Sequence, residues 1–261
     1  MSVDSYLANL ASEMVIRDSK KESISLSIST LHSRLKEYFG KDIIDVIKFG
    51  SYTRGTILPR RYDDKSDVDI MIVFNNDYDY KPQTFLDRLK KFAQQKYSTS
   101  YVYQSNPTIV LELNHIKLEL VPAVKIYSWS DDYYNIPYNS SSWLVTRPKA
   151  FDNLLVECNK NNLNKIKPIV RLIKHWNIVN NYRDADSYQL EKKIAEEMKY
   201  SYFSCSSYSD YLKQALQVIR LYSSEYRIDL AISRIDKALN LEAEGYPYSA
   251  ESEIKKVFPG I

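Results

Sequence analysis

The 261-residue sequence has few of the residues that support thiolate, zinc or histidine chemistry. It contains two cysteines and three histidines. Cys158 and Cys205 belong to no CxxC or His/Cys spacing, which excludes the common zinc sites and fits a reduced, cytoplasmic setting. The histidines, at positions 32, 115 and 175, lie on separate segments. A histidine acid-base site is therefore not expected.

Long apolar runs and a strong excess of charge are also missing. No stretch of about 18 apolar residues occurs, and residues 1–14 lack the basic start and apolar run of a secretion signal. We therefore expect a soluble, cytoplasmic protein without a membrane partner. The formal net charge of +3 gives no indication of a nucleic-acid activator.

Glycine is scarce, and two of the five glycines fall in one motif, "GSYTRGT" at residues 50–56. Its GxxxxG spacing is that of a P-loop, but Thr56 and Ile57 stand where a P-loop needs Lys and Ser or Thr, which excludes a Walker-type NTPase. Two interpretations remain. The backbone N–H groups and the Ser51 hydroxyl form a phosphate cradle, or the glycines only allow a strand-to-helix turn.

The hydrophobic periodicity changes along the chain. Residues 4–39 have apolar residues at three- and four-residue spacing, which predicts helix, although "SISLSIST" also alternates strictly and leaves a strand open. Four short segments rich in Ile and Val predict strands, namely "IIDVIKF", "DVDIMIVF", "TIVLELN" and "IKLELVPAV". From about residue 150 the patterns are helical. The chain is therefore expected to be α+β, with a helical second half.

Two of the predicted strands carry carboxylates among apolar residues. Because side chains alternate along a strand, Asp67 and Asp69 project from the face opposite the apolar residues of "DVDIMIVF". Glu119 projects likewise from "IKLELVPAV", and three carboxylates converge if the two strands are neighbours. The alternative is that these are solvated residues on a half-exposed strand. Glu112, on a strand without a glycine turn nearby, is interpreted as a surface residue.

Three crowded carboxylates repel one another unless a cation is present. Oxygen-only ligands with open positions suit Mg²⁺ or Mn²⁺, and two such ions about 4 Å apart can hold the attacking and leaving oxygens of a phosphoryl transfer. A pair of divalent ions is therefore the cofactor that this pattern indicates.

The order of these motifs resembles known nucleotidyltransferases. The glycine-serine turn, the aspartates about 16 residues later and the carboxylate in "LELVPA" resemble the superfamily that includes DNA polymerase beta. Further along, "SSWLVTRPKAF", "NKNNLNKIKPIVRLIKHWN" and "SYQLE" resemble the bacterial cGAS/DncV-like nucleotidyltransferases (CD-NTases). The resemblance spans roughly residues 20–200. It implies a polymerase-beta-like core, a mixed sheet flanked by helices, in residues 1–150. A helical domain in residues 151–261 would complete a bilobed protein with the active site in the cleft.

The resemblance also assigns roles in the first half of the chain. Asp67, Asp69 and Glu119 become the catalytic residues, which bind two Mg²⁺ or Mn²⁺ ions. Many relatives have aspartate at the third position. Gly50 and Ser51 become contacts of the donor triphosphate.

The helical half contributes three further residues to the implied nucleotide site. Helical spacing places Lys167, Arg171 and Lys174 on one basic stripe. The alternative is a solvated helix face, which is the interpretation of Lys167, whereas relatives have a lysine that reaches the triphosphate at the position of Lys174. Ser187 is a phosphate contact and Tyr188 a base-stacking ring by the same resemblance. Asp186 or Ser187 is equally a candidate for the N-cap of the following helix.

The implied activity is the joining of NTPs, ATP or another NTP, into a cyclic di- or trinucleotide. A ribose hydroxyl would attack the α-phosphate of a bound NTP and release pyrophosphate. In the family such a diffusible product acts on an effector in bacterial anti-phage (CBASS) signalling. Two alternatives remain, an RNA-terminal nucleotidyltransferase of the CCA-adding or poly(A) type and an inactive nucleotide-binding regulator. The sequence does not specify the bases, the linkages or the ring size.

Overall fold

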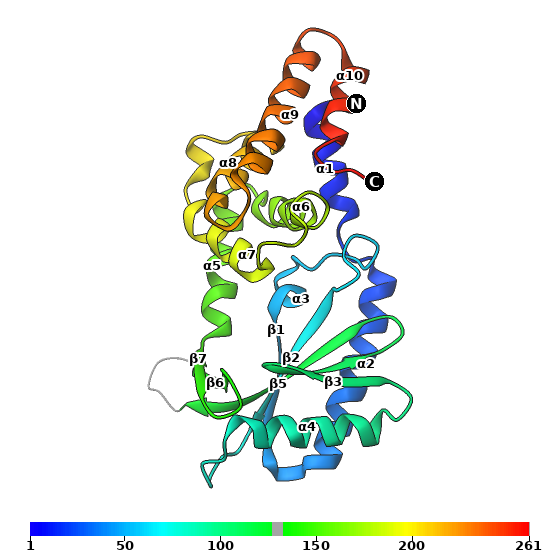
Figure 1. The fold of residues 1–261 in the computed structure, drawn as a ribbon, viewed down its shortest axis with the longest axis vertical. Helices are drawn as coiled ribbons and strands as arrows, with labels where there is room; N and C mark the ends of the chain where they lie inside the picture. Colours follow the sequence, from blue (N-terminus) through cyan, green and yellow to red (C-terminus); the bar gives the residue numbers. More distant parts are fainter. Residues whose placement is uncertain (127–132, 261) are drawn as a thin grey trace. The chain divides into compact units, whose positions relative to one another are not determined.

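The computed structural model of the protein describes residues 1–126 and 133–260 (Figure 1). Its longer helices are α1 (Val3–Glu13), α2 (Asp18–Phe39), α4 (Pro82–Lys96), α5 (Pro148–Asn161), α6 (Ile166–Val179), α7 (Ser187–Glu197), α8 (Tyr208–Val218), α9 (Glu225–Ala243) and α10 (Pro247–Lys255), and α3 (Gly50–Arg54) is one short turn. The strands are β1 (Ile43–Phe49), β2 (Asp67–Phe74), β3 (Tyr101–Ser105), β4 (Thr108–Glu112), β5 (Lys117–Ile126), β6 (Tyr133–Pro137) and β7 (Trp143–Thr146). Within the described ranges, every helix is too short or too polar to traverse a lipid bilayer.

The chain divides into two compact units. The sheet unit contains Arg17–Arg54 and Lys65–Ala150, and the helical unit contains Met1–Ile16, Gly55–Asp64 and the segment from Phe151 onward. The sheet unit ends at Ala150. Residues 1–16 and 55–64, which the sequence assigns to the first domain, belong with the helices.

The sheet unit is built on one mixed sheet, as expected. In the described part of the chain, seven strands run in the order β1-β2-β5-β4-β3, with β6 paired to β5 and β7 to β6. β2 and β5 are parallel, and the other pairs are antiparallel. The sequence interpretation names β1, β2, β4 and β5. It omits β3, β6 and β7, which are only four or five residues long.

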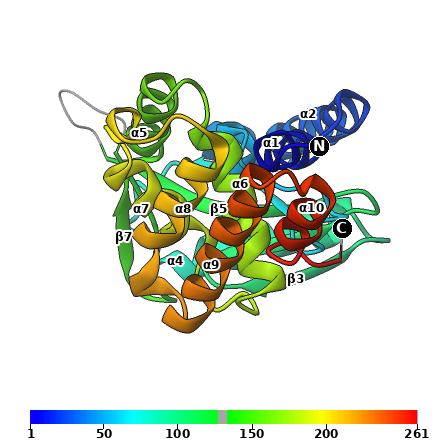
Figure 2. The ribbon, with the colours of Figure 1, turned by 90° about the horizontal axis from the view of Figure 1, so that it is seen from above.

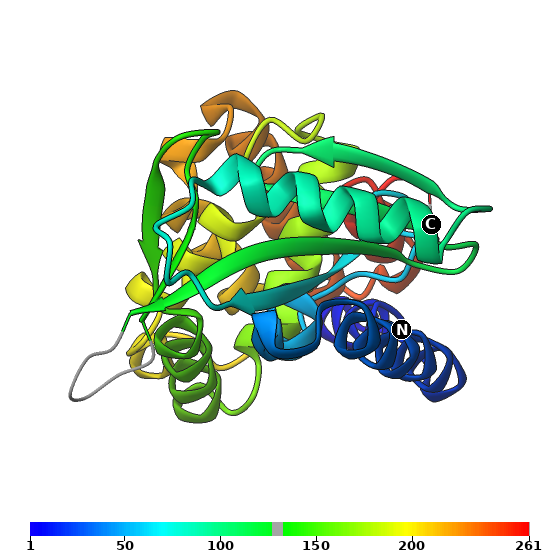
Figure 3. The ribbon, with the colours of Figure 1, turned by 90° about the horizontal axis from the view of Figure 1, so that it is seen from below.

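One face of the sheet is covered by α2 and α4. The four apolar residues that alternate along β2 are fully buried, namely Val68, Ile70, Ile72 and Phe74. The Phe74 ring lies 5.3 Å from Phe39 of α2 and 5.0 Å from Phe85 of α4, and Figure 3 shows α4 lying across the sheet. The segment "SISLSIST" is part of α2 and not a strand. Ile24 of this segment begins a buried helical stripe that continues with Leu31 and Leu35, whereas Leu26 is exposed.

The opposite face of β2 is apolar near one end of the strand and acidic near the other. Near its C-terminal end, Met71 and Val73 are fully buried and form a small apolar cluster with Ala123 and Tyr134. Near its N-terminal end, the same face presents only Asp67 and Asp69. Because successive side chains alternate, the aspartates lie on the side of the sheet away from α2 and α4. The strand is therefore anchored at one end and polar at the other.

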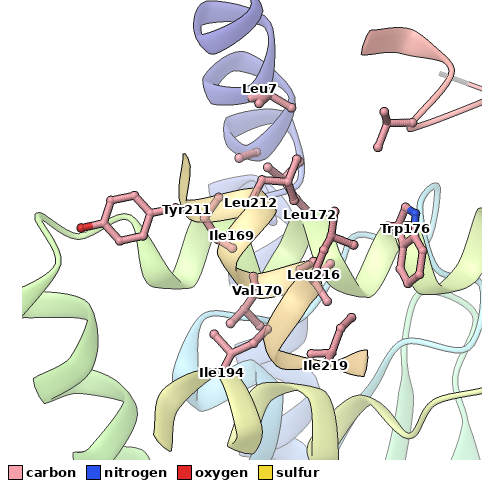
Figure 4. Packing of buried hydrophobic residues seen from close by; sticks show 14 of the residues in the cluster. Leu7, Ile169, Val170, Leu172, Trp176, Ile194, Tyr211, Leu212, Leu216 and Ile219 are labelled. Carbon is pink, nitrogen blue, oxygen red and sulfur yellow. The ribbon is translucent and has the colours of Figure 1, made fainter. Parts of the chain in front are cut away.

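The helical unit is organised around α6. Its residues Ile169, Val170, Leu172 and Trp176 are buried against α1, α7 and α8 (Figure 4). α9 and α10 form an adjacent pair near the N-terminal helix (Figure 2). The backbone N–H of Val3 donates to the Glu242 carboxylate at 3.3 Å. The first helix of the chain thus packs with the last ones.

His175 of α6 provides a pH dependence of stability within this unit. It is 4% exposed, its ring stacks on Phe258, and Tyr62 meets it edge-on. Burial lowers the pKa of His175, and the Tyr62 backbone and the Asp63 carboxylate oppose this effect only in part. The native state therefore holds His175 neutral, whereas the unfolded chain takes up its proton near pH 6.5. We expect the free energy of unfolding to be unaffected by this group above that pH and to decrease as the pH falls below about 6.5.

Urea unfolding between pH 5 and 8 measures this effect. His175→Gln is expected to reduce the slope of the free energy of unfolding against pH below about pH 6.5, because it removes the titrating ring. This holds even if the substitution itself destabilises the protein. Ile173→Val, at a fully buried position of the same helix, is the control, because it disturbs the packing without removing a titrating ring and should keep the slope of the parent. An unchanged slope in His175→Gln would contradict the prediction.

Candidate active site

The two acidic strands are direct neighbours in the sheet. β2 and β5 pair in parallel with Asp69 opposite Glu119 and Asp67 opposite Lys117. Both strands have buried apolar residues at the alternate positions, including Leu118 and Leu120, which are fully buried. The register therefore places the carboxylates on the same face. The pairing of β2 with β5, on which the expected convergence of the carboxylates depends, is present.

A lysine joins two of the three carboxylates. Lys117 Nζ lies 3.1 Å from Asp67 Oδ2 and 3.1 Å from Glu119 Oε1. Burial alone would lower the pKa of Lys117, but Asp67 and Glu119 together raise it. Burial, reinforced by Asp67, raises the pKa of Glu119 in spite of Lys117. The cluster thus concentrates negative charge where solvent screens it poorly, and the lysine offsets part of it.

Asp69, the carboxylate that Lys117 does not join to the others, packs against the glycine-serine turn. Gly50 begins α3 directly after β1 and has φ +76°, a conformation that side chains other than glycine's rarely adopt. A Cβ on Gly50 would stand 1.9 Å from Asp69 Oδ2 and 2.7 Å from Asp69 Cγ. The absence of a side chain is therefore what allows Asp69 its position. Ser51 follows as the second residue of α3 and is half-buried.

The carboxylates fit a divalent cation by their chemistry. Asp67 and Glu119 offer oxygen ligands only and already share one cation, the ammonium of Lys117. Carboxylate oxygens suit Mg²⁺ and Mn²⁺. As the side chains are placed, no three carboxylate, imidazole or thiolate groups of residues 1–126 and 133–260 meet at metal-binding distance.

The helical unit holds Lys174 in a buried network. Its Nζ lies 3.0 Å from Glu191 Oε1 and 3.2 Å from the Thr56 carbonyl oxygen, and Thr56 Oγ1 donates to the same Glu191 oxygen at 2.8 Å. The side chains of Lys174 and Glu191 are 6% and 1% exposed. Arg171 is also buried, and it donates to the carbonyl oxygens of Ala11 and Gly55. Arg171 and Lys174 therefore do not lie on a solvated face, whereas Lys167 is half-buried.

Ser187 and Tyr188 open α7. Asp186 is the N-cap, since its carboxylate accepts from the Gln189 backbone N–H at 2.9 Å, as one of the sequence interpretations has it. Ser187 is half-buried in the first turn. Tyr188 is 46% exposed and touches Phe151 with its ring edge. Its ring retains an accessible surface.

Sequence reasoning gave no role to Lys117, Thr56 and Glu191. Lys117 precedes Glu119 by two residues, so strand alternation alone places it on the same face, and that signal was available. Glu191, the last residue of "SYQLE", gives no comparable signal, because its partner Lys174 lies on another helix. Glu112, interpreted as a surface residue, accepts from the Tyr103 hydroxyl at 3.2 Å.

Residues 1–159 match the model of the Second Messenger Oligonucleotide or Dinucleotide Synthetase domain. The chain belongs to this family. The match covers the glycine-serine turn and all three carboxylates. The membership confirms the resemblance to CD-NTases and agrees with a mixed sheet followed by helices.

Members and neighbours of the family extend the similarity beyond residue 159. A cyclic AMP-AMP-AMP synthase of an Acinetobacter species is 28% identical over 211 residues, which are 77% of this chain and 60% of the relative. A probable cyclic nucleotide synthase of Bacillus cereus is 24% identical over 85% of this chain and 82% of its own length. The chain thus spans less than two thirds of the Acinetobacter relative, 60% of its length, and most of the Bacillus one.

A solved structure covers nearly the whole chain. The Vibrio cholerae DncV cyclic AMP-GMP synthase, determined with a linear pppA(3′,5′)pG intermediate, matches with a TM-score of 0.76 at 10% identity, over 96% of this chain and 93% of that one. At this identity the likeness establishes the fold alone.

Proposed function

We propose that the protein is a metal-dependent nucleotidyltransferase that joins NTPs into a cyclic di- or trinucleotide with release of pyrophosphate. The observation that carries the proposal is the parallel register of β2 and β5, which sets Asp69 opposite Glu119 and lets Asp67 and Glu119 share one cation beside the Gly50 turn. Family membership supports it, as do the curated relatives, one of which is named for a cyclic AMP-AMP-AMP product. ATP is accordingly proposed among the substrates.

The chain's own residues have distinct parts in the proposed reaction. Asp67, Asp69 and Glu119 hold a pair of divalent ions, which when bound lower the pKa of the attacking ribose hydroxyl and neutralise the charge on the triphosphate. Gly50 leaves room for the Asp69 carboxylate, and the backbone N–H groups of the turn and the Ser51 hydroxyl are the groups offered to the phosphate. These groups orient the α-phosphate for in-line attack.

In the helical unit, Lys174 and Ser187 are proposed as phosphate contacts and Tyr188 as the base-stacking ring. The hydrogen bonds of Lys174 to Glu191 and to the Thr56 carbonyl hold its ammonium in one orientation before any nucleotide binds. The exposed ring of Tyr188 suits stacking, worth roughly 1–3 kcal/mol with little discrimination among bases. We further propose that the diffusible product acts on an effector in bacterial anti-phage signalling.

Mass spectrometry of the products from a mixture of four NTPs tests the proposal. With Mg²⁺ or Mn²⁺ we expect pyrophosphate release and a product that resists phosphatase, because a ring has no terminal phosphate. A parallel reaction with labelled tRNA distinguishes this activity from that of an RNA-terminal nucleotidyltransferase. Extension of the tRNA without a cyclic product, or no consumption of any NTP, would contradict the assignment.

A further inference from the structure

Lys117 occupies a position in the candidate site that the proposed chemistry does not use. Its ammonium nitrogen stands between Asp67 Oδ2 and Glu119 Oε1, at 3.1 Å from each. Its side chain is 15% exposed, less than that of either acid. A lysine here is thus well shielded from solvent and bound to two carboxylates at once.

The fold itself brings this lysine to the acids. The parallel register sets Lys117 opposite Asp67, and the alternation of β5 puts it on the same face as Glu119, two residues later. Both contacts therefore follow from backbone pairing and do not depend on a flexible loop. Every molecule with this sheet has the ammonium within reach of the two carboxylates.

The contacts neutralise charge that is otherwise costly. Asp67 and Glu119 would repel each other at this separation in a partly desolvated setting, and a single cation between them reverses the sign of the interaction. A divalent ion held by the same two acids would draw on the same oxygens and repel the ammonium. The four-carbon stem of lysine carries a compact charge that can rotate away, whereas the rigid strands keep the carboxylates in place.

We propose that Lys117 is a positioning residue that holds Asp67 and Glu119 together in the metal-free protein and withdraws from them when a divalent ion binds. This inference rests on the proposed metal-dependent function. It makes Lys117 an internal competitor of the metal, so that the affinity for the ion is set partly by how readily the lysine leaves.

Metal binding and thermal unfolding, measured on the full chain with Mn²⁺ as the probe, test the proposal. Lys117→Met keeps the aliphatic stem and removes the charge. We expect its dissociation constant for Mn²⁺, from calorimetric titration, to be at least about tenfold lower than that of the parent. Without metal, its melting temperature should be lower by roughly 4 °C or more, because two carboxylates lose their counter-ion. Saturating Mn²⁺ should close most of this gap.

Two further variants separate charge from structure. Lys117→Arg keeps a cation between the acids and should melt close to the parent without metal. Lys48→Met removes an exposed lysine of the neighbouring strand β1. In the register between β1 and β2, Lys48 is opposite Ile70 and not opposite an acidic residue. It should leave both the melting temperature and the Mn²⁺ affinity unchanged.

The outcomes distinguish this inference from the function on which it rests. If the parent binds Mn²⁺ and consumes ATP but Lys117→Met has the same affinity, or a melting gap that Mn²⁺ does not close, the inference is wrong and the function stands. If the parent binds no Mn²⁺, both fail together. Should Lys117→Met fold only in the presence of Mn²⁺, the proposal is supported. If it does not fold even then, the metal cannot replace the ammonium and the proposal is overturned.

Discussion

The double replacement of Asp67 and Asp69 by asparagine is expected to reduce nucleotide turnover by at least about 10³-fold while the protein remains folded. Asparagine has nearly the shape of aspartate, but its amide is a poor ligand for Mg²⁺. The loss of the charge stabilisation that a metal pair provides in the transition state amounts to several kcal/mol. Pyrophosphate release, followed with ATP and Mn²⁺, measures the effect.

Glu112→Gln is the matched control for this experiment. Glu112 is a carboxylate of the same sheet, on β4 opposite Lys117 of β5, and it accepts from the Tyr103 hydroxyl. We expect it to retain turnover within a few-fold of the parent. Circular dichroism and the melting temperature verify that the double variant is folded. Parental turnover in that variant would show that the acidic strand pair is not where the chemistry occurs.

Gly50→Ala, which adds a single methyl group, is expected to lower turnover by at least about 10²-fold. The new Cβ would collide with the carboxylate of Asp69, 1.9 Å away, and the backbone φ of +76° would be strained in addition. The aspartate has to move, and a displacement of about 1 Å at a reacting centre is enough for such a loss. Steady-state turnover at saturating ATP is the measurement.

Gly55→Ala is the control that distinguishes the collision with Asp69 from the strain of a positive φ. Gly55 has nearly the same backbone conformation, with φ +73°, but a Cβ there would meet no atom of the described residues within 4 Å. Both variants should therefore lose about 1–2 kcal/mol of stability from the left-handed backbone. Only Gly50→Ala should lose turnover beyond that. Equal turnover in the two variants would mean that Asp69 tolerates displacement.

The acidic strands could be predicted because each rule they obey is local. Alternation along β2 and β5 assigns Asp67, Asp69 and Glu119 to faces without any knowledge of the partners. The register between the strands is not local. Only the structure shows that Asp69 is opposite Glu119, and that Lys117 therefore reaches Asp67. A shift of one residue would have sent these side chains to different faces.

The buried network of the helical unit could not be predicted from the sequence, for a different reason. Helical spacing groups Arg171 and Lys174 into a basic stripe, which on an isolated helix is typical of a solvated face. Burial comes from neighbours that lie far apart in the sequence, such as Thr56 and Glu191. Likewise, residues 1–16 have a helical pattern, but no pattern within them indicates that they pack with α6 and α8 instead of the sheet.

The interleaved division of the chain affects the order in which the protein is completed during synthesis. The segment Met1–Ile16 leaves the ribosome well before most of its packing partners, which begin at residue 151. Buried side chains of α1 such as Leu7 and Leu10 thus remain uncovered while more than half of the polypeptide is translated. The sheet unit has all its segments by residue 150 and is able to form earlier. Fragments that stop at residue 150 would therefore leave an apolar N-terminal helix uncovered and prone to aggregate.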